Sequence, residues 1–138
     1  MSERAEPRVT GSRAQLAVRP VQMLIRLCGL VMVSLGLLFW TGHALFLIPL
    51  HLAVGFLLVL ALWTLAGLGA RAGVHPGFVA LVLGWSLLMP ALGLTQDRLL
   101  VGDAHWVIQL LHLLVGVAAI GQAEGLGARI RQRQQAVA

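Results

Sequence analysis

The segment from residue 50 to residue 62 reads LHLAVGFLLVLAL and contains no charged side chain. It lies within an apolar stretch over residues 44–69, and a helix that crosses a bilayer needs about 20 such residues. The stretch therefore predicts a transmembrane helix. His51 stands inside it, where an ionisable side chain is costly in lipid and indicates a function or a partner.

Three further segments have the same character. Of the 138 residues 59% are hydrophobic and 11% are charged, with a mean hydropathy of +0.89. A soluble domain of this length cannot bury so much apolar surface. We therefore expect an all-α protein, one integral membrane domain over residues 1–138. Its four spans are predicted over residues 21–41, 44–69, 77–95 and 105–124.

The ten arginines predict the orientation of these spans. Arg98 stands alone after the third span, whereas the other nine lie before or at the beginning of the first span, after the second or after the fourth. The positive-inside rule then places both termini and Arg71 in the cytoplasm, with the loop at 96–104 outside. The arginines are too scattered for a nucleic-acid site. We expect the cytoplasmic (inner) membrane of a bacterium.

Prolines mark the predicted helix ends. Pro20 and Pro76 fall where the first helical residues of spans one and three are expected, a position that tolerates a missing N–H. Pro49 and Pro90 stand inside apolar runs. They either kink spans two and three, or span two begins after residue 44.

The chain contains an internal repeat. His-Leu-x-Val-Gly occurs in spans two and four, and two further elements recur in the same order at offsets of 57 and 58 residues. The three pairs are 32–37 with 89–94, 51–55 with 112–116, and 67–71 with 125–129. The repeat predicts a duplicated helical hairpin that forms a transmembrane four-helix bundle, with spans two and four parallel.

The two repeated histidines are predicted to face each other across this bundle. His51 comes eight residues after His43, and His112 comes seven after His105. At 1.5 Å per residue the separations are about 12 and 10.5 Å, so the deeper histidines lie at similar depth. Neutral imidazole is a good axial ligand for haem iron. The sequence thus predicts one haem b held by His51 and His112.

Other residues are candidates for the same site. Gly55 and Gly116 follow the ligands by four residues and share their helical faces, where a missing side chain lets a flat macrocycle approach. Gly36 and Gly93 on the other spans could open the remaining walls. The haem propionates could point outward to Arg98 or to two histidines near the outer interface, His43 and His105.

Three other interpretations of these patterns stay open. The glycines can simply allow close helix packing. His51 and His112 can form a hydrogen bond across the interface, or bind a bare metal ion, although zinc and copper prefer more ligands than these two. Glu124, an acid near the end of a span, can be solvated or pair with Arg129.

The run Leu50-His51-Leu52-Ala53-Val54-Gly55, with its leucine-rich continuation to Arg71, resembles the second helix of the cytochrome b561 family. The resemblance implies a four-helix membrane cytochrome that binds haem b through histidine pairs. That family usually has a histidine in its first helix and two widely spaced ones in its fourth. Span one here has none, so only ligation by His51 and His112 is carried over.

The leading functional hypothesis is a b-type cytochrome that passes electrons between a membrane donor such as quinol and an acceptor outside. The alternative is a non-enzymatic membrane protein: a small transporter, a haem or metal carrier, or an assembly subunit. A haem-dependent oxidoreductase is a third option. No catalytic side chain is identified, since nucleotide, flavin and hydrolase motifs are missing from the sequence. The oligomeric state is left open.

Overall fold

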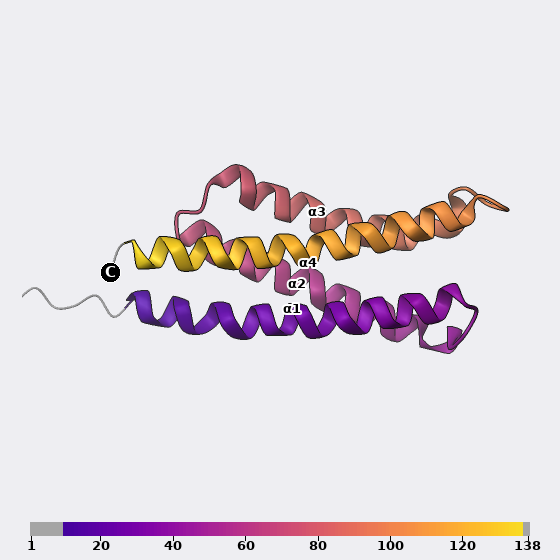
Figure 1. Ribbon diagram of the computed structural model, residues 1–138, viewed down its shortest axis with the longest axis horizontal. Coiled ribbons are helices and arrows are strands. Elements are labelled where there is room, and N and C mark those ends of the chain that lie inside the picture. Colours follow the sequence, from indigo (N-terminus) through magenta and orange to yellow (C-terminus); the bar gives the residue numbers. More distant parts are fainter. Residues whose placement is uncertain (1–9, 137–138) are drawn as a thin grey trace, which may run out of the picture.

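The protein forms an all-α four-helix bundle (Figure 1). The computed structural model describes residues 10–136, with side chains from residue 17. Each helix is long and apolar enough to cross a membrane, as expected of a multi-pass membrane protein. The main helices are α1 (Thr10–Trp40), α2 (Ile48–Arg71), α3 (Pro76–Thr95) and α4 (His105–Gln135), with short 3-10 turns η1 (Leu45–Leu47) and η2 (Gln96–Arg98).

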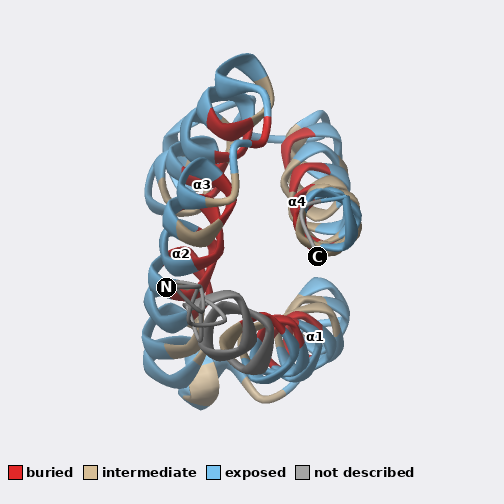
Figure 2. Cartoon of the chain, turned by 90° about the vertical axis from the view of Figure 1, so that its left-hand side faces the viewer, coloured by how far each residue is buried: buried red, intermediate tan, exposed pale blue. Residues whose placement is uncertain are grey.

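We call the end with η1 and η2 the outer end and the opposite end the inner end, after the predicted orientation. Figure 2 looks along the bundle, with the helices in the order α1, α2, α3, α4 around it and the buried residues turned inward. Each helix contacts its two neighbours, and α2 also contacts α4 across the bundle. Within the described residues α1 and α3 do not meet. The two helices that carry the repeated histidines are therefore the diagonal pair in contact.

Three of the four prolines in or near the spans have clear places in this fold. Pro49 stands in the first turn of α2, so this helix begins after residue 44, and Pro76 is the first residue of α3 as predicted. Pro90 lies inside α3.

The prediction for Pro20 was wrong, because α1 begins at Thr10 and Pro20 lies inside it. Proline costs a helix one backbone hydrogen bond. Near the inner end, water can bond the carbonyl that loses its partner. The fourth helix also continues to Gln135, beyond the predicted end of its span at residue 124.

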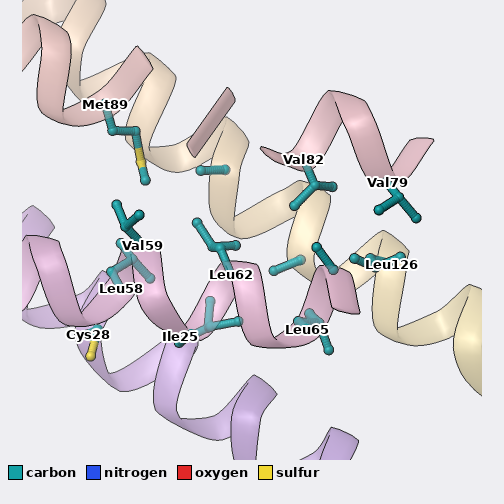
Figure 3. Close-up of a cluster of buried hydrophobic side chains, with 14 of the residues drawn as sticks. Ile25, Cys28, Leu58, Val59, Leu62, Leu65, Val79, Val82, Met89 and Leu126 are labelled. Atoms are coloured by element: carbon teal, nitrogen blue, oxygen red, sulfur yellow. The ribbon is translucent and has the colours of Figure 1, made fainter. Parts of the chain in front are cut away.

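A cluster of buried hydrophobic side chains occupies the inner half of the bundle, and Figure 3 shows part of it. Aliphatic side chains from all four helices meet there. Protein cores of this kind are close-packed and contain few voids. Ser86 and Gln22 are the buried polar residues in the described part of the chain. Ser86 donates to the Leu83 carbonyl and accepts from the Trp63 indole. The fully buried large aliphatic side chains are Val18, Ile25, Leu62, Leu65, Val82, Leu126 and Ile130.

A polar cluster joins α1 to α4 beside this core. Arg26 donates to Glu124 through Nε at 2.7 Å and Nη2 at 2.8 Å. Of the two alternatives considered for Glu124, solvation and a pair with Arg129, the pair with Arg129 is not formed. Five residues turn a helix by about 140°, so Arg129 faces away from Glu124. Its guanidinium lies over the Phe78 ring instead, 3.9 Å from the ring centre.

Candidate cofactor-binding site

A cavity of about 470 Å³ occupies the outer half of the bundle. All four helices line it, and η2 contributes Gln96 and Asp97 at its outer end. The α1 side chains that face it recur every three or four residues, as one face of a helix requires. The other lining residues that matter below are Met32, Gly36, Phe39, His51, Gly55, Met89, Gly93, His112 and Gly116.

His51 and His112 face this cavity from α2 and α4, and their ring centres are 6.4 Å apart. Each ring nitrogen lies about 1.2 Å from its ring centre, so two nitrogens are at least about 4 Å apart, beyond hydrogen-bond distance. The predicted alternative of a direct hydrogen bond is thus not formed. A metal–imidazole bond is about 2.0–2.1 Å long, so the spacing has room for one metal ion between two nitrogens.

Both imidazoles have an unsatisfied nitrogen. Nδ1 of His51 and Nδ1 of His112 are buried, and neither has a hydrogen-bond partner among the described residues. Buried polar atoms are nearly always paired, and an unpaired one in a native protein indicates a missing water or ion. The described residues therefore leave both nitrogens available to a partner, as they also leave the side-chain oxygens of Gln122 and Gln134.

With only two histidines as possible metal ligands, the site favours a metal that arrives with other coordinating atoms already bound to it. Among the described residues there is no group of three or more His, Cys, Asp or Glu side chains that could hold a metal ion. A zinc site needs three or four protein ligands. Two histidines suit a haem instead, because the macrocycle supplies four nitrogens and leaves two axial positions. The residues present fit this group.

The glycines around the cavity have two different roles. A methyl group at Gly36 or Gly116 would have no atom within 4 Å, so these positions border open space. At Gly93 it would lie 3.1 Å from Cε1 of His112, and at Gly55 it would lie 3.2 Å from the Met32 methyl. Gly93 on α3 thus provides the room that the His112 ring occupies.

Two aromatic residues that contact the histidine-bearing helices were not among the predicted site residues: Phe39, which lines the cavity, and Trp85, which lies outside its lining. Phe39 on α1 meets the His51 ring edge to face, with ring centres 5.4 Å apart. Trp85 on α3 donates to the carbonyl of Val115, three residues after His112, at 2.9 Å. Nothing in the sequence marks these two residues, because aromatic side chains are common in apolar helices. Their contacts depend on how the helices pack.

Three predicted residues lie apart from the cavity lining. His43 is exposed, with Nδ1 3.0 Å from the Thr41 hydroxyl, and Nδ1 of His105 lies 3.3 Å from the Leu99 carbonyl. Arg98 is exposed in η2. The side chain of Asp97, next to it, lines the cavity in its place.

No family model, curated protein or solved structure matches this chain. The resemblance to the cytochrome b561 family therefore stays a prediction, and the functional argument rests on the geometry of the cavity.

Proposed function

We propose that this protein is a membrane b-type cytochrome that binds one haem between His51 and His112 and transfers electrons. The observation that carries the proposal is the pair of imidazoles that face one cavity with ring centres 6.4 Å apart, each with a buried, unpaired nitrogen.

His51 and His112 would supply the two axial ligands. Gly36 and Gly116, which border open space, would leave room for the flat faces of the macrocycle, and Gly93 would keep the His112 ring in place. Apolar side chains, among them leucine, methionine and phenylalanine, line most of the cavity, and they would exclude water from the group.

A haem would supply reversible one-electron chemistry at its iron. Two histidine ligands would occupy both axial positions, and this favours electron transfer over oxygen binding. The residues of this chain would then hold the group and shield it from water. A partner could approach at the outer end of the cavity, where Gln96 and Asp97 line it.

We infer that the protein resides in the cytoplasmic membrane of a bacterium, with its arginine-rich end inside. On this orientation the cavity lies near the outer face. A quinol from the bilayer is then a suitable electron donor, and a carrier outside the membrane a suitable acceptor.

The proposal is tested by visible spectra of the detergent-purified protein in its oxidised and reduced forms. Wild type should show the sharp bands of low-spin haem, and these should be lost in His51→Ala and in His112→Ala. His43→Ala and His75→Ala are the matched controls, since both histidines are exposed and outside the cavity.

A colourless wild type that cannot be reconstituted with haem would overturn the proposal. Loosely held haem that exchanges with a scavenger but does not cycle between redox states would instead identify a haem carrier. Bands that survive in either alanine variant would exclude paired axial ligation.

A further inference from the structure

A second cleft, of about 450 Å³, lies at the inner ends of α1 and α4, at the opposite end of the bundle from the histidines. The side chains of Arg19, Gln22, Met23, Arg26 and Arg131 line it. The cleft is therefore separate from the proposed haem site, and none of its arginines belongs to that site.

Gln22 organises this cleft. Its side chain is buried, with 4% of its surface exposed, and its amide donates to the Ala123 carbonyl at 3.4 Å and to Glu124 at 3.3 Å. Its oxygen accepts from Nη1 of Arg131 at 2.6 Å. A methyl group at Gly127 would overlap this amide, so the glycine makes the arrangement possible.

The cleft has an excess of positive charge. Three guanidinium groups surround it, and Glu124 is the one carboxylate among the described residues that pairs with any of them. Arg26 uses Nε and Nη2 on Glu124, and Arg131 uses one N–H on Gln22. A guanidinium has five donors, so most of them are left for a ligand, and their planar forks suit the oxygens of a phosphate.

Next to the arginines α1 presents apolar side chains to the outside. Met23 lines the cleft and is 56% exposed, and Leu27 and Leu30 follow along the helix with 55% and 67% exposed. A phosphate group above a strip of exposed apolar side chains matches the chemistry of a phospholipid, and basic pockets between transmembrane helices bind such headgroups.

We propose that this cleft binds the phosphate of an anionic phospholipid in the leaflet on the arginine-rich side, with the acyl chains along Met23, Leu27 and Leu30. The lipid would then join α1 to α4 at the end where the Arg26–Glu124 pair already links them. Free phosphate has the same chemistry as the headgroup but has no acyl chains to contact Met23, Leu27 and Leu30.

The test is native mass spectrometry of the full chain, released from micelles that contain phosphatidylglycerol or phosphatidylcholine. Wild type should retain phosphatidylglycerol at least tenfold more than phosphatidylcholine. Each arginine near a membrane surface contributes about fivefold to the affinity for anionic lipid, so Arg19→Gln with Arg131→Gln should weaken retention by roughly 25-fold.

The control variant is Arg71→Gln with Arg133→Gln, which removes the same charge from the same end but outside the cleft. It should retain the lipid, and circular dichroism should show unchanged helix content in both variants. Equal losses in the two variants would overturn the proposal in favour of unspecific charge. If the wild type binds inorganic phosphate but retains no lipid, the lipid assignment fails.

Discussion

Helix glycines have opposite effects on packing in the outer and inner halves of this bundle. In the outer half Gly36 and Gly116 border open space, and the helices enclose a cavity. In the inner half Gly69 and Gly127 face filled space: a methyl group at Gly69 would lie 2.8 Å from Leu126 Cδ1, and one at Gly127 would overlap Gln22. A glycine in a membrane helix therefore either keeps a space open or lets a neighbour fill it.

The largest effect on stability is expected from the solid half. Leu65 is completely buried in the inner core, so Leu65→Ala should lower the free energy of unfolding by about 2–5 kcal/mol through lost contacts and a new void. Unfolding in mixed micelles with increasing denaturing detergent measures this.

Leu60→Ala is the control for that change. Leu60 is on the same helix, but 57% of its surface is exposed towards lipid, so the substitution should change the free energy of unfolding by about 0.5 kcal/mol or less. Equal losses at both positions would mean that the inner half is not the rigid part of the molecule.

A smaller effect is expected from the polar link between α1 and α4. Gln22→Leu keeps a similar volume but removes the hydrogen bonds that the buried amide makes with Glu124, Arg131 and the Ala123 carbonyl. It should cost about 1–3 kcal/mol of unfolding free energy. Hydrogen exchange should accelerate at the inner ends of α1 and α4 and stay unchanged around the cavity; a uniform change would contradict the division into halves.

The smallest effect on stability, and a specific effect on the cavity, is expected at Gly93. Gly93→Ala places a methyl group 3.1 Å from Cε1 of His112, so the ring must shift by a few tenths of an ångström. Changes around metal-binding histidines typically reduce affinity at least about tenfold, so haem retention should fall by that factor with little loss of stability.

Gly84→Ala is the matched variant, because Gly84 is on the same helix but outside the cavity lining, and a methyl group there has no atom within 4 Å. It should leave the spectrum and the haem retention of the wild type unchanged. If Gly84→Ala and Gly93→Ala behave alike, the contact between Gly93 and the His112 ring has no part in holding the ligand.

Much of the fold follows from the sequence because the bilayer restricts it. Apolar length alone predicts four helices, and Pro76 predicts the start of α3. Pro20 does not mark the start of α1, since a helix that extends past the membrane can retain a proline near its inner end. The partner of Glu124 was also beyond prediction: Arg26 is 98 residues away, and only the packing of α1 on α4 brings the two together.

For the candidate site, the sequence predicts the pair of histidines but not the residues around them. The repeated motif places His51 and His112 at one depth, and the fold then brings their rings together. The surroundings of the rings depend on which face each helix turns inward. This is why Phe39 and Trp85 were missed, and why His43 and Arg98, close in depth, lie outside the cavity lining.

The solid inner core has a consequence for bioenergetics. Among the described residues it contains no second pair of histidines, and its aliphatic side chains act as an electrical insulator between the cavity and the arginine-rich end. A redox centre confined to the outer half would receive and release electrons on one side of the bilayer. Such a protein would serve electron traffic without moving charge across the membrane, and so without building a membrane potential.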